Sequence, residues 1–144
     1  MSPFEAFLSQ LAIVLEFKNL KPDSQGACQI LMKKEQVSLL FEYDSIVVPH
    51  TVLLSSPLCQ INEGNQNILA QILKKNKNTE ATFSLKEADH HIYLHRRLSC
   101  TISKEHLKSA LDSFLHLIKN FQKDLLSQPA VSKKEEVFGT HFKV

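Results

Sequence analysis

The run HHIYLHRR, residues 90–97, is the obvious place in this sequence to look for a chemical site. Zinc needs imidazole nitrogens about 2 Å from the metal. On a strand, residues four apart lie about 13 Å from each other, and His90 points to the opposite face from His91 and His95. The strand alone therefore cannot form a metal site. We interpret these histidines as polar residues on a half-buried strand and predict no metal centre.

Three cysteines, Cys28, Cys59 and Cys100, are the next candidates for chemistry. A cysteine and a histidine that act together meet in space and not in sequence, so the pattern leaves a nucleophilic pair open. Each cysteine lies in an apolar or loop context without a catalytic motif around it, which favours a small buried thiol. An odd count at wide spacing favours reduced thiols in a cytoplasm. We predict that the chain is not an enzyme.

The composition argues against nucleotide cofactors and nucleic acids. The chain has only three glycines, and neither GxxxxGK[ST] nor GxGxxG occurs, so loops that cradle phosphates are absent and we predict no cofactor. Its 17 basic and 15 acidic residues leave a net charge of +2, and only Arg96 and Arg97 are arginine. This is not the charge distribution of a nucleic-acid binder. Lysines cluster at 33–34, 74–77 and 133–134; we interpret them as solvated, with an acidic partner as the alternative.

Residues 2–17, SPFEAFLSQLAIVLEF, predict a helix and not a signal peptide or a membrane span. Ser2 and Glu5 have capping-box spacing, and Pro3 falls at the first helical position. Polar residues interrupt the apolar run, and the first basic residue is Lys18, whereas a signal peptide begins with positive charge. We therefore expect the chain to stay in the compartment where it is made, without membrane contact.

The remaining pattern alternates strands and turns before a long final helix. Strands are predicted over 27–33, 36–43, 45–54, 81–87 and 91–99, and helices over 64–78 and from Ser103 to Pro129. Pro49 cannot donate to a ladder, so the third strand should be an edge strand or carry a bulge there. Residues 55–64 are predicted to form a loop. The order α-β-β-β-α-β-β-α indicates an α+β fold, with an antiparallel sheet packed against helices. One domain should cover 1–127, followed by a charged tail at 128–144.

The predicted second and third strands carry large apolar side chains on both faces. A sheet that is apolar on both faces needs a second covering layer. We infer a homodimer and a docking surface for another chain, because uncovered apolar patches mark interaction sites. The alternative is that tilted helices of the same chain cover both faces.

This arrangement resembles class I type III secretion chaperones of the CesT, or Tir-chaperone, type. The resemblance covers residues 2–127 and rests on six features in order. They are the capped helix, the segment KPDSQGACQILMK, the three-strand meander, the short central helix, the hairpin ATFSLKEADHHIYLHRRLS and the long helix. It implies a bacterial cytoplasmic homodimer, or a heterodimer with a sister chaperone, without enzymatic activity. Such a protein would bind the N-terminal segment of a secreted effector or gatekeeper protein in an extended state and deliver it to the secretion apparatus.

The resemblance also places two sets of site residues. The cargo-binding residues it implies are Leu8, Leu11, Leu15, Ile30, Met32, Leu39 and Phe41. The implied dimer contact uses Ile68, Ile72, Ile92 and Leu94. A charged residue at Leu11 or Phe41 should then abolish cargo binding without dissociating the dimer.

One departure from the family pattern is charge, since members are commonly acidic and this chain is slightly basic, with a pI near 8.4. An acidic cargo or a second partner would account for it. The alternative function is a protein-binding regulator of transcription, linked to secretion through contact with RNA polymerase or a sigma factor.

Overall fold

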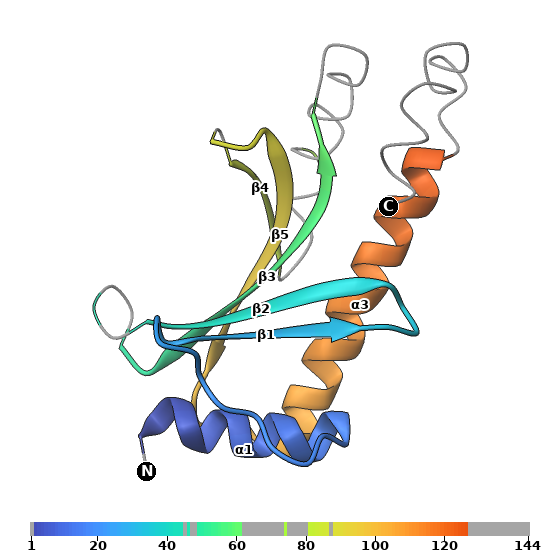
Figure 1. Cartoon of the computed structure of the whole chain (residues 1–144). Helices are drawn as coiled ribbons and strands as arrows, with labels where there is room; N and C mark the ends of the chain where they lie inside the picture. The colour runs from blue at the N-terminus through green and yellow to red at the C-terminus, as the bar shows by residue number, and fades with distance from the viewer. Residues whose placement is uncertain are drawn as a thin grey trace. The chain divides into compact units, whose positions relative to one another are not determined.

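The computed structural model describes residues 2–44, 46, 49–61, 74, 81–86 and 88–126. Figure 1 shows the elements in these ranges. They are α1 (Pro3–Leu15), β1 (Ala27–Met32), β2 (Val37–Asp44), β3 (Thr51–Gln60), β4 (Thr82–Lys86), β5 (His91–Ser99) and α3 (Lys104–Leu126). The helix predicted over 64–78 and the tail predicted over 128–144 lie outside the described residues.

The strands form one sheet in the order β1-β2-β3-β5-β4. The pairs β1–β2, β2–β3 and β4–β5 are antiparallel, which confirms the predicted α+β class. A tight turn at 33–36 joins β1 and β2, which correspond to the strands predicted over 27–33 and 36–43. Arg97 on β5 ties the strands together through its guanidinium, which donates to the Asp44 carboxylate at 2.8 Å and to the Thr51 hydroxyl at 3.2 Å.

The chain divides into two compact units, which share β3, β5 and α3. The first contains residues 1–56 and 96–114, and the second contains residues 57–95 and 115–144. Each unit has a core of its own, and each is described by itself below.

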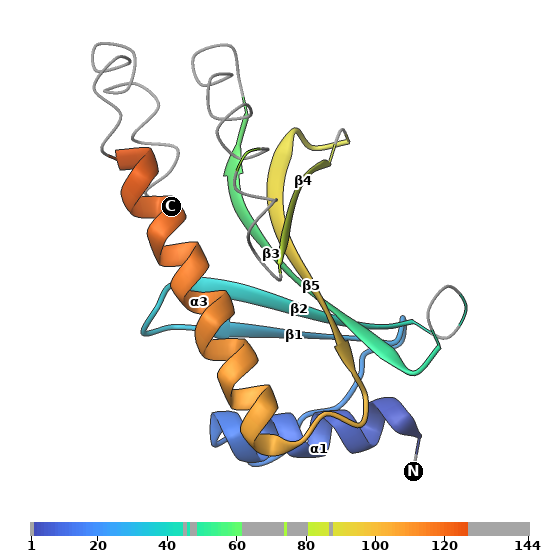
Figure 2. The same cartoon turned by 180° about the vertical axis from the view of Figure 1, so that it is seen from behind.

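In the first unit, α1 begins as predicted and packs against the sheet. The Glu5 amide donates to the Ser2 hydroxyl at 3.1 Å, which satisfies one of the free amides of the first turn. The ring of Phe7 lies 6.0 Å from that of Phe41 on β2. Figures 1 and 2 both show α1 beside the first turns of α3, where Gln10 donates to the carbonyl of Ile102 at 2.9 Å.

The end of α1 stores backbone strain. Glu16 caps the helix in the left-handed region, with φ 61° and ψ 35°, a conformation that costs about 1–2 kcal/mol for residues with a Cβ. Glycine is the usual residue at this position. We expect Glu16→Gly to raise the free energy of unfolding by about 0.5–1 kcal/mol, because the lost strain exceeds the greater chain entropy of glycine. Urea denaturation measures the change, and Glu16→Ala is the control, since it keeps the Cβ. An equal gain from alanine would contradict the explanation.

The third predicted strand is displaced along the chain. Thr51 begins β3, and Pro49 and His50 lie in the turn before it, so the prediction of a strand from residue 45 with an edge or bulge at Pro49 was wrong. Ile46 is 86% exposed and does not share the buried face of Val52 and Leu54. Proline lacks the amide that a ladder needs, and this explains the late start.

The loop predicted over 55–64 was wrong at residues 55–60, which continue β3, and residues 62–64 lie outside the described residues. Ser55 and Ser56 are buried at 4% and 1% exposure, and Cys59 is buried at 5%. Their small polar side chains suggested a loop, whereas pairing with neighbouring strands places them inside the protein.

In the second unit, β4, β5 and the later turns of α3 supply the core. The rings of Phe83 and Phe121 lie 5.8 Å apart. Ser103 caps α3 as predicted, since its hydroxyl accepts from the His106 amide at 3.2 Å. Apolar side chains recur every three or four residues along this helix, and they are buried at Leu107, Leu111, Phe114, Ile118 and Phe121.

Candidate functional site

The residues predicted to bind cargo lie on α1, β1 and β2, mostly on the inner face of the first unit. Five of them are at most 3% exposed in the single chain: Leu8, Leu11, Ile30, Leu39 and Phe41. Leu15 and Met32 are half-buried. The structure therefore gives the five a packing role within the chain. Cargo contact by the set stays a prediction.

Two of the four residues predicted to form the dimer contact are likewise buried within the single chain. Ile92 and Leu94 on β5 are 1% and 0% exposed, because they face the core of the second unit. Ile68 and Ile72 lie outside the described residues. The outward positions of the same strand are His91, Tyr93 and His95, each half-buried, which confirms the interpretation of HHIYLHRR as a half-buried strand.

Another group of apolar side chains is exposed. In the part of the chain that the structure describes, the large exposed apolar residues are Ile13, Phe17, Leu31, Ile46 and Leu85. Ile13 is 63% exposed and Leu31 is 60% exposed, so most of each side chain lies outside the core of the chain. Ile13 and Leu31 were not among the predicted site residues, because the predicted set follows the apolar residues that recur along one face of the helix or strand. Both lie off those faces, and an apolar residue off the main apolar face is the sequence signal that could have indicated them.

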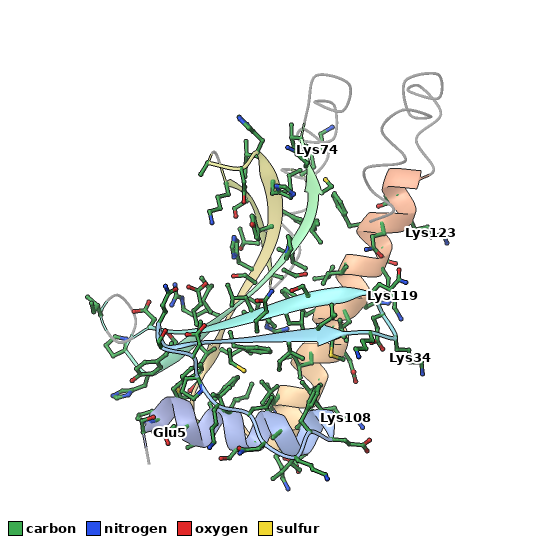
Figure 3. The ribbon with its side chains drawn as sticks, viewed as in Figure 1. Glu5, Lys34, Lys74, Lys108, Lys119 and Lys123 are labelled. Atoms are coloured by element: carbon green, nitrogen blue, oxygen red, sulfur yellow. The ribbon has the colours of Figure 1, made fainter. Side chains whose placement is uncertain are left out.

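The lysines described by the structure lie at the surface, as predicted for a solvated face. Lys33 and Lys34 are exposed in the turn between β1 and β2, and Lys74 is exposed as well. Figure 3 labels Glu5 on α1 and Lys34 on the β1–β2 turn, together with Lys108, Lys119 and Lys123 on α3. The lysines at 75, 77 and 133–134 lie outside the described residues.

Within the described ranges, no three His, Cys, Asp or Glu side chains come close enough together to hold a metal ion. None of the helices described is long and apolar enough to cross a membrane.

All three thiols are buried and unpaired. Burial raises the pKa of Cys59 to about 12, and it raises the pKa of Cys100. Burial and the nearby charge of Asp23 raise the pKa of Cys28. A raised pKa keeps a thiol in its neutral form, which is a poor nucleophile.

Burial and the raised pKa values predict that the three thiols are modified slowly in the folded protein. In the folded protein at pH 8, we expect all three cysteines to react with a thiol-specific disulfide reagent at least about 100-fold more slowly than in urea, because burial disfavours both access and the thiolate. Time-resolved absorbance measures the rates. The matched control is the same protein unfolded at the same pH, and a fast-reacting cysteine in the folded protein would contradict the prediction.

Solved structures of several protein complexes contain a chain with a similar fold. A chain of the HopA1–SchA chaperone–effector complex matches with a TM-score of 0.68 at 19% identity, over 84% of this chain and 94% of that one. A chain of the ExsC–ExsE complex matches with a TM-score of 0.69 at 17% identity, over 83% and 90%. The Yersinia pestis type III secretion chaperone SycH, in complex with a fragment of YscM2, matches with a TM-score of 0.66 at 17% identity, over 82% and 98%.

Comparison by sequence gives the family directly. No curated protein matches the sequence. The sequence model of the Tir chaperone protein (CesT) family matches residues 6–122, which is most of the chain and includes every strand described above. The chain belongs to the Tir chaperone protein (CesT) family.

Proposed function

We propose that the protein is a type III secretion chaperone. It binds the N-terminal segment of a secreted effector or gatekeeper protein, holds that segment extended and delivers it to the secretion apparatus. The observation that carries the proposal is the family match over residues 6–122. The fold agrees with it, since similar structures contain chaperones bound to an effector or another protein.

The exposed apolar side chains of the first unit are the proposed contact surface for this cargo. Ile13 on α1, Phe17 just after it and Leu31 on β1 are each more than 40% exposed. Leu15 and Met32, from the predicted cargo-binding set, are half-buried on the same two elements. An extended segment can bury its own apolar side chains against such residues, which stabilises the complex by removing both surfaces from water.

The proposal includes the state in which the chaperone works. It is a homodimer, or a heterodimer with a sister chaperone, in the bacterial cytoplasm. It acts by binding and not by catalysis, and the buried thiols with raised pKa values support this. It needs no cofactor and does not contact nucleic acid or the membrane.

The test is affinity purification of the tagged full chain from its native cell, followed by mass spectrometry. We expect a secreted protein that is retained through its N-terminal region, and truncation of that region should abolish retention. Recovery of RNA polymerase subunits or a sigma factor without a secreted protein would overturn the proposal in favour of the transcriptional regulator.

A further inference from the structure

The strand β1 forms one edge of the sheet, as Figures 1 and 2 show, and β2 is its neighbour in the strand order. The Asp23 amide donates to the Ala27 carbonyl at 2.7 Å, and the Ala27 amide donates to the Asp23 carboxylate at 3.0 Å. Both backbone groups of Ala27 therefore point away from β2. Because this direction alternates along an antiparallel strand, the amides and carbonyls of Gln29 and Leu31 also point to the outer edge.

This edge has the properties of a surface that accepts another strand. Natural edge strands avoid further pairing through charged residues, proline or a bulge, and the sequence of β1, ACQILM, contains neither a charge nor a proline. Leu31 is 60% exposed on the outer side of the strand. The charged residues KKE follow at 33–35, in the turn after β1. A strand that pairs here therefore needs an apolar residue opposite Leu31 and charges opposite to KKE beside it.

Residues 134–140 of the same chain, KEEVFGT, carry this pattern and lie outside the described residues. We call them the tail segment. Placed antiparallel to β1 with Phe138 opposite Leu31, the tail segment meets an opposite charge at three consecutive positions. A shift of two residues in either direction would put Glu136 or Thr140 opposite Leu31. The facing pairs in the first register are Glu35–Lys134, Lys34–Glu135, Lys33–Glu136, Met32–Val137, Leu31–Phe138, Ile30–Gly139 and Gln29–Thr140.

The chain between α3 and the tail segment is long enough for this contact. Eight residue steps separate Leu126, the end of α3, from Lys134, and an extended chain of this length spans about 26 Å. Phe114 is the last residue of α3 in the first unit, and it lies about 18 Å from Leu126 along the helix. The tail segment can therefore return to the first unit, which contains β1.

We propose that the tail segment adds to the outer edge of β1 as an antiparallel strand of the same chain, and that the cargo must displace it. The backbone groups of Gln29 and Leu31 supply its hydrogen bonds, and the facing side chains fix its register. Leu31 also belongs to the proposed cargo surface, so the tail segment and the cargo compete. The strand itself does not depend on the proposed function, whereas the competition rests on it.

Disulfide trapping in the full chain tests the register. Gln29 and Thr140 form a hydrogen-bonded pair in the proposed strand, with Cα atoms about 5.5 Å apart, which a disulfide can bridge. We expect the variant Gln29→Cys, Thr140→Cys to form a disulfide within one chain on mild oxidation. Gln29→Cys, His141→Cys is the matched control, since residue 141 has nearly the same tether but points to the other face. It should close at least about 10-fold more slowly.

Amide hydrogen exchange, followed for each residue by nuclear magnetic resonance, tests the strand without new cysteines. If the tail segment occupies the edge about three-quarters of the time, the amides of Gln29 and Leu31 exchange about 4-fold more slowly than in the variant Phe138→Asp. The same occupancy lowers the apparent affinity for cargo, so Phe138→Asp should bind the effector segment about 4-fold more tightly. Ser132→Asp, which adds the same charge before the tail segment, should match the unmodified chain in both measurements.

Three results overturn the strand. They are equal closure rates for the two cysteine pairs, a disulfide that joins two chains on a non-reducing gel, and exchange that Phe138→Asp leaves unchanged. Slower exchange in the unmodified chain together with equal cargo affinity overturns the competition. The proposed function is judged separately, by effector capture. Protected amides and the expected disulfide without any captured effector support the strand and count against the secretion role.

Discussion

Replacing Phe41 by alanine is expected to lower the free energy of unfolding by about 3–5 kcal/mol. Phe41 is fully buried on β2, where its register partners are Cys28 on β1 and Leu54 on β3, and its ring lies 6.0 Å from the tilted ring of Phe7. Alanine leaves a cavity between α1 and the sheet that these neighbours cannot fill. Urea denaturation followed by circular dichroism measures the loss.

The control for this variant is Leu31→Ala, on the neighbouring strand. Leu31 is 60% exposed, so its truncation removes little buried surface, and we expect a change within about 0.5 kcal/mol. Equal losses for the two variants would mean that burial in the single chain does not decide stability here.

The same burial changes how cargo binding can be tested. The resemblance to secretion chaperones implied that a charged residue at Leu11 or Phe41 would abolish cargo binding and leave the dimer intact. Both side chains are 0% exposed. A charge there would lie inside the core of the first unit without a partner, which is strongly destabilising. We therefore expect such variants to unfold, so a loss of cargo binding by them would carry no information about the contact surface.

The double variant Ile13→Asp, Phe17→Asp is expected to weaken cargo binding by about 10- to 100-fold while leaving the fold intact. Both side chains are exposed, so the folded chain tolerates the change. In the proposed complex they are buried against apolar side chains of the cargo, and a few such residues carry most of the binding energy at an interface. Isothermal titration with the N-terminal segment of the captured effector measures the affinity.

A matched variant separates a specific contact from a general effect of charge. Ile46→Asp alters a residue that is 86% exposed and lies between β2 and β3, away from α1 and β1 in sequence. It should bind the cargo segment as tightly as the unmodified chain, and circular dichroism should show both variants folded. A loss of the same size for Ile46→Asp would refute the contact surface proposed on α1.

Local features of this protein followed from the sequence by itself. The cap at Ser2, the turn at 33–36 and the start of α3 after Ser103 depend on residues close together in the chain, and all three are present. The apolar seam of α3 and the alternation of β5 also follow, since helix and strand periodicity decide which residues share a face. These patterns were sufficient for the α+β class and for the resemblance to secretion chaperones.

Other features depended on contacts between distant segments. Ser55 and Ser56 form strand because β3 pairs with its neighbours, whereas their residue types favour a loop. An apolar stripe likewise does not reveal whether it faces the chain's own core or a partner. Only the tertiary structure decided that Leu11 and Phe41 pack inside and that Ile13 and Leu31 face water, because burial is a property of the assembled elements and not of any one of them.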